Sequence, residues 1–228
     1  YYLLEMARKS NAKGYIFLSS GEVYGQLPEH VETITEETFG SLNPLELRSC
    51  YGEGKRAGET LCALYAHQYN IPATIVRIGH TFGPTMDVEN DSRVFAEFVR
   101  CVLHGENLVM KSDGSTVRPF CYVRDAVDGI LRVLLCGIPG QAYLMVGDEY
   151  FSILELAELL CSLYPERNLQ VVRQTRSKED RYLESAYQQK KLVSAKKLKA
   201  LGWRVNVGIK EGFERTICAL ESKKDVGV

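Results

Sequence analysis

The sequence has 228 residues, of which 45% are hydrophobic and 25% charged, and its formal net charge is −1. This length suits one large domain or two small ones, and the composition is that of an ordinary globular protein. The near-neutral charge argues against a nucleic-acid-binding surface, and no apolar run approaches the about 20 residues that a membrane-spanning helix needs.

The first elements are expected from short apolar patterns. Residues 1–9 are amphipathic and predict the end of a helix, which a turn with a glycine follows at 11–14. Residues 15–18 (YIFL) form a continuous apolar run that is typical of a buried parallel strand. The run ends at Ser19 and Ser20, where the carboxyl end of a strand in an α/β sheet places reactive groups.

The next segments predict a βαβ unit. Residues 26–49 are polar and predict a loop, and residues 48–69 predict a helix that stops at Asn70. The expected apolar face of this helix consists of Ala57, Leu61, Leu64, Tyr65 and Gln68. Residues 73–78 are rich in β-branched side chains and predict a second strand. A strand, a helix and a strand with short joints belong to one parallel sheet.

The rest of the chain alternates in the same way. Residues 79–91 predict a turn-rich loop, 173–188 a charged irregular stretch, and Ser152 with Glu155 resembles a capping box. The remaining predicted elements are helices at 94–103, 124–135, 153–163, 195–201 and 207–220, and strands at 108–111, 120–123, 142–146 and 169–172.

The seven cysteines contain no CxxC pair and are odd in number. Several lie at apolar helical positions, so we interpret them as buried free thiols in a reducing cytoplasm. The ligand spacings of a zinc site are absent. We therefore expect no metal.

Residues 51–55 (YGEGK) place a phenol and an ammonium four residues apart, on one face of the predicted helix. An ammonium near the Tyr51 side chain favours its phenolate, which can then take a proton from a sugar hydroxyl while hydride leaves the carbon. The hydroxyl of Ser20 could bond the same sugar oxygen. A pair such as Tyr51 and Lys55 arises about once by chance in a chain of this composition, so its context decides the interpretation.

That context resembles a known family. Its motifs are FLSSGEVYG at 17–25, YGEGKR at 51–56, RIGHTFGP at 77–84, DSRVF at 91–95 and VRPFCYVRD at 117–125. Together they are similar to the extended short-chain dehydrogenase/reductase family of nucleotide-sugar enzymes. The nearest branch is UDP-glucuronate decarboxylase, a lyase, beside 4,6-dehydratases and 4-epimerases.

The resemblance implies an α/β fold, the C-terminal part of a Rossmann-type doubly wound parallel sheet with a smaller α/β substrate-binding lobe. Residues 1–90 and 122–150 would form the remainder of the NAD-binding domain, and residues 91–121 and 151–228 the nucleotide-sugar lobe. The resemblance further implies a catalytic set of Ser20, Glu22, Tyr51 and Lys55 that oxidises C4 of the sugar with NAD. It assigns cofactor contacts to Ser19, Tyr51, Lys55 and Ile78, and substrate contacts to His80, Thr81, Arg93 and Arg118.

Two positions help to choose the branch. Dehydratases of this family carry an Asp-Glu pair where this chain has Gly21 and Glu22, so the acid for dehydration is missing. Decarboxylases keep the Glu without the Asp. Oxidation at C4 then creates a β-keto acid, whose loss of CO2 needs no strong base because the ketone accepts the electrons. Glu22 could alternatively be a solvated turn carboxylate.

The substrate residues are less distinctive. Arg93 and Arg118 are candidates for the diphosphate because a guanidinium donates two parallel hydrogen bonds to phosphate, although either could be a surface arginine. His80 departs from the asparagine of the decarboxylases, and Lys111 replaces an aromatic residue that often flanks the base. The sugar and the base therefore stay open.

No glycine-rich loop follows a first strand, and the family would have about 100 residues before this point. We therefore expect a fragment that binds NAD weakly or not at all. A homodimer through the helix that carries Tyr51 is typical of the family. The alternatives are a 4-epimerase, a 4,6-dehydratase, or a homologue that binds without catalysis.

Overall fold

The structure is a computed structural model that describes residues 1–174 and 191–226, with side chains up to residue 223. The chain divides into two compact units, each built from separate stretches of sequence. The first unit contains residues 1–79, 125–146 and 184–204, and the second contains residues 80–124, 147–183 and 205–228. The predicted domains are also interleaved, with other bounds, and their assignment to cofactor and substrate stays a prediction.

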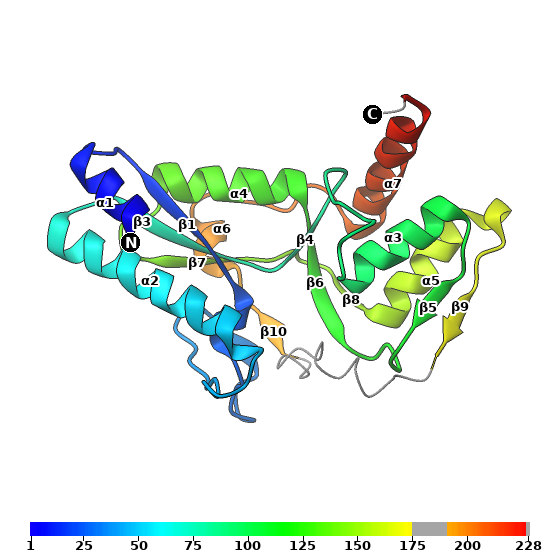
Figure 1. Cartoon of the computed structure of the whole chain (residues 1–228), viewed down its shortest axis with the longest axis horizontal. Helices are drawn as coiled ribbons and strands as arrows, with labels where there is room; N and C mark the ends of the chain where they lie inside the picture. The colour runs from blue at the N-terminus through cyan, green and yellow to red at the C-terminus, as the bar shows by residue number, and fades with distance from the viewer. Residues whose placement is uncertain (175–190, 227–228) are drawn as a thin grey trace. The chain divides into compact units, whose positions relative to one another are not determined.

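The first unit is built on a parallel sheet of β1 (Tyr15–Ser20), β3 (Ala73–Ile78) and β7 (Ala142–Met145), with β3 in the middle (Figure 1). The helix α2 (Ser49–Tyr69) connects β1 to β3, which confirms the predicted βαβ unit. Ser20 is paired in register with Ile78, so both lie at the carboxyl edge of the sheet.

The buried face of α2 differs from the predicted one. Cys62 and Tyr65 pack with α1 (Tyr2–Lys9) and β3, whereas Ala57, Leu64 and Gln68 are exposed. Leu61 and Tyr65 of the predicted face do pack in this core, but the other three residues were assigned to the wrong side, because both sides of α2 carry apolar residues. Hydrophobic periodicity alone cannot tell which side meets the sheet.

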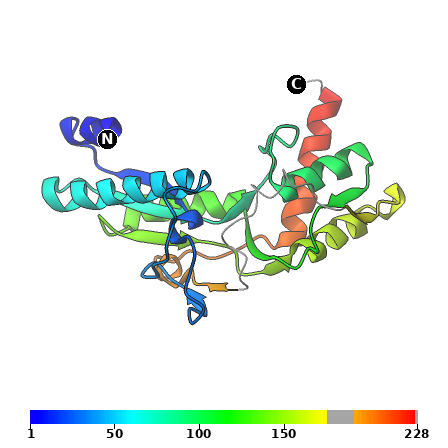
Figure 2. The same cartoon turned by 60° about the horizontal axis from the view of Figure 1, so that its bottom comes forward.

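The predicted loop after β1 has structure of its own. The 3₁₀ helix η1 (Gly21–Tyr24) precedes it, and the loop itself includes β2 (Thr33–Ile34), which pairs in parallel with β10 (Leu192–Val193) (Figure 2). The Glu36 carboxylate accepts a 2.7 Å hydrogen bond from the amide of Leu144 in β7. The loop is thereby attached to the edge strand of the sheet.

The helices α4 (Val123–Cys136) and α6 (Lys196–Ala200) also contribute to the first unit. The indole nitrogen of the buried Trp203 donates a 2.8 Å hydrogen bond to the carbonyl of Asp125. This bond ties the segment after α6 to the start of α4.

The second unit contains the sheet β4 (His80–Phe82), β6 (Val117–Tyr122) and β8 (Tyr150–Ser152), and the pair β5 (Leu108–Met110) and β9 (Val171–Arg173). Its helices are α3 (Val94–His104), α5 (Ile153–Leu163), η2 (Pro165–Arg167) and α7 (Ile209–Val226). Aromatic residues form the centre of its core, where the rings of Phe82 and Phe213 stack at 3.9 Å.

Several local predictions are confirmed and others are corrected. The capping box of Ser152 and Glu155 is present. Strand β4 lies in a segment that was predicted to be a loop, because it is stabilised by pairing with β6 rather than by a local pattern. All seven cysteines are free, but Cys50, Cys136 and Cys218 are exposed rather than buried. The predicted irregular stretch at 173–188 falls mostly outside the described residues.

No helix in the described part of the chain is both long and apolar enough to cross a bilayer.

Candidate active site

The strand β1 ends in two serines whose side chains point to opposite sides, as the alternation along a strand requires. Ser20 is the N-cap of η1, and its hydroxyl accepts a 3.2 Å hydrogen bond from the amide of Glu22. Ser19 is buried, and its hydroxyl donates to the Glu59 carboxylate at 2.5 Å. Ser20 therefore faces the strand-to-helix turn, whereas the Ser19 hydroxyl donates its proton to Glu59 and could contact a cofactor only as an acceptor.

The helix α2 presents Tyr51 and Lys55 one turn apart. The Lys55 ammonium donates a 2.7 Å hydrogen bond to the carbonyl of Leu18 in β1, and it lies 5.5 Å from the centre of the Tyr51 ring. It also lies 5.3 Å from the centre of the Phe17 ring. Tyr51 is 52% exposed, so its phenol is open to a ligand rather than enclosed in the core.

The segment with Ser20 packs directly on the start of α2. A Cβ at Gly52 would lie 2.9 Å from the carbonyl oxygen of Glu22, which shows how closely the two backbones approach. The Glu22 carboxylate lies 3.8 Å from the guanidinium of Arg48, and Arg56 donates a 2.7 Å bond to the carbonyl of Val23. The structure therefore brings the predicted catalytic segments together within the first unit.

Ile78 is the last residue of β3 and is half-buried beside Ser20 in the register of the sheet. The four residues that were predicted to contact the cofactor thus lie at the carboxyl edge of the sheet or on the helix above it. Sequence reasoning missed Glu59 as a residue of this region. Its spacing of four residues from Lys55 was the available signal, since such spacing puts both side chains on one helix face.

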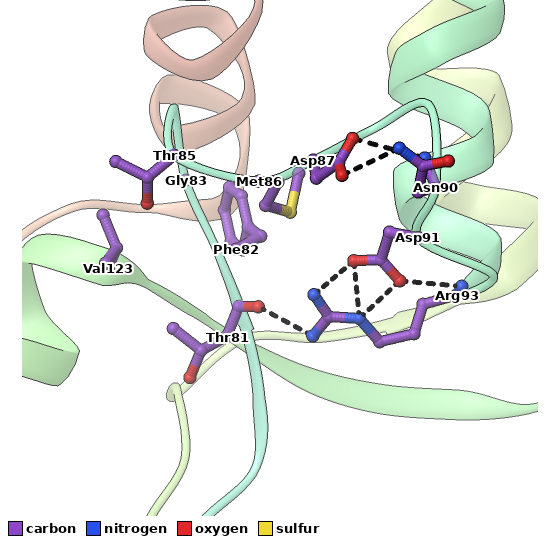
Figure 3. A pocket seen from close by; sticks show the side chains of 10 residues that line it. All are labelled: Thr81, Phe82, Gly83, Thr85, Met86, Asp87, Asn90, Asp91, Arg93 and Val123. Carbon is purple, nitrogen blue, oxygen red and sulfur yellow. Dashed lines mark hydrogen bonds and ion pairs between the residues drawn. The ribbon is translucent and has the colours of Figure 1, made fainter.

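The predicted substrate residues all belong to the second unit. Thr81 and Arg93 line a hollow of about 390 Å³ (Figure 3). The other lining residues are Phe82, Gly83, Thr85, Met86, Asp87, Asn90, Asp91 and Val123. The Thr81 hydroxyl is buried and has no hydrogen-bond partner among the described residues. A ligand with a donor or an acceptor could satisfy it.

Arg93 is held by its neighbour Asp91. The guanidinium Nε lies 2.9 Å from both carboxylate oxygens, and Nη2 lies 2.5 Å from Oδ2 (Figure 3). These hydrogen bonds hold the pKa of Asp91 below its usual value. A third nitrogen, Nη1, lies 3.5 Å from the carbonyl of Thr81. The arginine is thus oriented into the hollow while half of its side chain stays exposed.

His80 is surrounded by aromatic rings and positive charge. Its ring centre lies 5.8 Å from that of Phe120 and 6.2 Å from that of Phe95. Burial, followed by the charges of Arg118 and Arg93, lowers the pKa of His80 to about 4. Arg118 itself is buried, and its Nη1 donates a 3.1 Å bond to the carbonyl of Val117. His80 is therefore a neutral imidazole at physiological pH. The positive charges of the two predicted phosphate-binding arginines help to keep it neutral.

No cluster of three metal-binding side chains occurs among residues 1–174 and 191–223.

Known proteins resemble this chain in sequence and in structure. The model of the NAD dependent epimerase/dehydratase family matches residues 1–145. UDP-glucuronic acid decarboxylase 6 of Arabidopsis thaliana is 35% identical over 212 residues, which cover 92% of this chain and 58% of the relative. UDP-glucuronic acid decarboxylase 1 of Danio rerio is 34% identical over 216 residues, or 94% of this chain and 49% of the relative. The chain spans about half the length of these curated relatives.

Two solved structures have the same fold. UDP-glucose 4-epimerase of Thermotoga maritima with UDP-glucose superimposes with a TM-score of 0.81 at 25% identity, over 98% of this chain and 68% of that one. The dTDP-glucose 4,6-dehydratase of Bacillus anthracis in complex with NAD gives a TM-score of 0.77 at 23% identity, over 98% and 66%.

Proposed function

The chain belongs to the NAD-dependent epimerase/dehydratase family, and we propose that it acts in a nucleotide-sugar enzyme that oxidises C4 with NAD and removes C6 as CO2. The observation that carries this proposal is the exposed Tyr51 phenol with the Lys55 ammonium held beside it by the strand that ends in Ser20. The sequence similarity to UDP-glucuronic acid decarboxylases favours decarboxylation over the other reactions of the family.

Each residue of the catalytic set has a role that its position supports. Tyr51 takes the proton of the C4 hydroxyl, and the positive charge of Lys55 stabilises the phenolate that does so. Ser20 donates a hydrogen bond to the same sugar oxygen, since its hydroxyl proton is not used by the amide of Glu22. Removal of the hydroxyl proton lets the carbon release its hydride.

The residues present fit the nicotinamide half of NAD. Gly21, at the carboxyl edge of the parallel sheet, has no atom within 4 Å of the position of a Cβ, so the backbone is open there. Leu18 occupies only one of the three N–H donors of Lys55. Lys55, Tyr51, Ile78 and the end of β1 would hold the cofactor. Bound NAD would supply a hydride acceptor for C4 and later return the hydride.

The C4 ketone makes decarboxylation possible without a strong base. The electrons of the bond between C5 and the carboxylate move toward the ketone oxygen, CO2 leaves, and C5 then takes a proton. Ser20 and Tyr51, now protonated, stabilise the negative charge on that oxygen by hydrogen bonds. Glu22 lies in this turn with Arg48 as its counter-ion. We propose that Glu22 orients the carboxyl group of the substrate or handles its proton.

The second unit supplies groups that suit a sugar nucleotide. Arg93 and Arg118 bind the diphosphate, and the neutral His80 and the buried hydroxyl of Thr81 form hydrogen bonds to the sugar. Phosphate contact by Arg93 means that it shares its guanidinium between Asp91 and the ligand. The guanidinium has five N–H donors, so it can bond a carboxylate and a phosphate at the same time.

We also propose that the protein is a cytoplasmic homodimer. Leu3 and Met6 on α1 and Leu64 on α2 are 65%, 64% and 47% exposed, and these two helices pack on each other. Apolar helix faces of this kind are typical of interfaces. The seven free thiols favour a reducing compartment, which fractionation of cells with a specific antibody would test.

The decisive assay uses the protein in its complete natural length with NAD and UDP-glucuronate labelled at C6. Release of labelled CO2 and formation of a UDP-pentose support the proposal. A product inverted at C4 indicates an epimerase, and a 4-keto-6-deoxy sugar from a UDP- or dTDP-hexose indicates a dehydratase. Binding of the nucleotide sugar without any product refutes catalysis and leaves a binding homologue.

A further inference from the structure

Glu59 extends the helix face that carries the proposed catalytic pair. Tyr51, Lys55 and Glu59 follow one another at intervals of four residues, so their side chains lie on the same side of α2. Lys55 contacts the backbone of β1, and Glu59 contacts the Ser19 side chain one residue further along that strand. This face of the helix is therefore attached to β1 at two successive turns.

The Glu59 carboxylate also binds Arg77 of β3. The Nε atom of Arg77 lies 3.0 Å and 3.2 Å from the two carboxylate oxygens, and Nη2 lies 2.8 Å from Oε2. Ser19 and Arg77 are direct partners in the register of β1 and β3. One carboxylate thus joins the carboxyl ends of both strands to the helix.

The remaining end of Arg77 reaches the segment that Ser20 caps. Its Nη1 donates to the hydroxyl oxygen of Tyr24 at 2.9 Å and to the carbonyl of Glu36 at 2.8 Å. Tyr24 is the last residue of η1, the 3₁₀ helix that begins after Ser20. Burial raises the pKa of the Tyr24 phenol, so it stays neutral.

The network is nearly enclosed, since the side chains of Arg77 and Glu59 are only 10% and 12% exposed. A buried ion pair gains little net stability because the loss of hydration offsets most of the attraction between the charges. Its directional bonds do fix the relative position of the elements they join. Three of the elements joined, β1, η1 and α2, hold Ser20, Glu22, Tyr51 and Lys55, and the fourth is β3.

We propose that Glu59 and Arg77 are positioning residues that hold the hydroxyl of Ser20 and the Tyr51–Lys55 face of α2 in one reactive geometry. This inference rests on the proposed function. A displacement of about 1 Å at reacting groups can lower a rate by about 100-fold, so the network matters for turnover more than for folding.

The test uses the full-length protein with the double substitution Glu59→Leu and Arg77→Met, which removes both charges together. We expect kcat to fall at least about tenfold, KM for the nucleotide sugar to change less than about threefold, and the melting temperature to stay within about 5 °C. A kcat within about twofold of the wild type in the folded double variant overturns the inference.

A second measurement does not depend on turnover or on the double variant folding. Glu59→Gln keeps the side-chain shape but weakens the bonds to Arg77 and Ser19. We expect faster amide hydrogen exchange at residues 21–24 and 49–56 than in the wild type. Unchanged exchange there overturns the inference. If the wild type has no activity on any nucleotide sugar, the proposed function fails, and the exchange result still decides the positioning role.

Glu5 offers a matched control. It accepts bonds from an arginine fork and one hydroxyl, those of Arg8 and Tyr65, at 2.7–3.0 Å, as Glu59 does from Arg77 and Ser19. It joins α1 to the far end of α2. Glu5→Gln should leave kcat and the exchange at 21–24 unchanged. Equal losses from Glu5→Gln and Glu59→Gln would show a general loss of stability and contradict a positioning role.

Discussion

The ammonium of Lys55 lies 2.7 Å from the carbonyl oxygen of Leu18, to which it donates a hydrogen bond. This bond orients the lysine against the strand that leads to Ser20, with its charge beside the Tyr51 ring. The geometry explains how an exposed phenol can act as a base while its activating charge stays in place.

Removal of the phenol should abolish most of the activity. We expect Tyr51→Phe to lower kcat about 10²- to 10⁴-fold, because a general base contributes this much to a rate. Tyr69→Phe, at the exposed end of the same helix, is the control and should keep wild-type activity. Steady-state kinetics of the full-length protein measure both. Equal kcat values for Tyr51→Phe and the wild type would exclude the phenol as the base.

Two glycines of α2 should respond oppositely to alanine. A Cβ at Gly58 would lie 2.3 Å from the Phe17 ring, so Gly58→Ala overpacks the contact of α2 with β1 and should cost about 1–3 kcal/mol of unfolding free energy. Gly54 has no atom within 4 Å of its Cβ position, and Gly54→Ala should gain about 0.5–1 kcal/mol through helix propensity. Urea denaturation gives both values. Stabilisation by Gly58→Ala would contradict the packing of Phe17 on the helix.

The depressed pKa of His80 predicts a loss of stability in acid. The unfolded protein binds a proton at this residue near pH 6.5, whereas the folded protein does so only near its pKa of about 4. His80 therefore lowers the unfolding free energy as the pH falls from about 6.5 toward 4, and has no such effect above pH 7. Denaturation of the wild type and of His80→Asn at several pH values tests this. The difference in unfolding free energy between the two proteins should be constant above pH 7 and change as the pH falls toward 4, and parallel curves throughout would contradict a depressed pKa of His80.

Nucleotide binding should depend on the arginine that lines the hollow. We expect Arg93→Gln to weaken binding of UDP by about tenfold or more, since charge-assisted hydrogen bonds to phosphate are lost. Arg100→Gln removes a partly exposed arginine of α3 that pairs with Glu106, and it should bind UDP as the wild type does. Titration calorimetry on the full-length protein distinguishes these outcomes. Similar affinities for both variants would place the diphosphate elsewhere.

Charge on the exposed apolar faces should disrupt a dimer. Leu64→Lys combined with Met6→Lys should shift the full-length protein from dimer to monomer, because lysines in an apolar interface lose their hydration. Leu45→Lys changes an equally apolar residue, 92% exposed on a loop, and should keep the wild-type state. Sedimentation equilibrium measures the masses. A wild-type monomer, or a double variant that stays dimeric, would contradict the proposed interface.

Features that depend on neighbouring residues along the chain could be predicted from the amino-acid pattern. The apolar run into Ser20, the spacing of Tyr51 and Lys55, and the Ser152–Glu155 capping box follow from local periodicity, which reflects the geometry of single strands and helices. The βαβ unit followed as well, because short joints leave few ways to connect its parts.

Features that depend on segments far apart in the sequence required the three-dimensional arrangement. It selected the buried face of α2, joined Glu59 to Ser19 and Arg77, and placed His80 among aromatic rings where its imidazole stays neutral. These outcomes depend on which strands pair and which surfaces lose water. The physical reason is that desolvation and long-range hydrogen bonding act between chain segments that no local spacing relates.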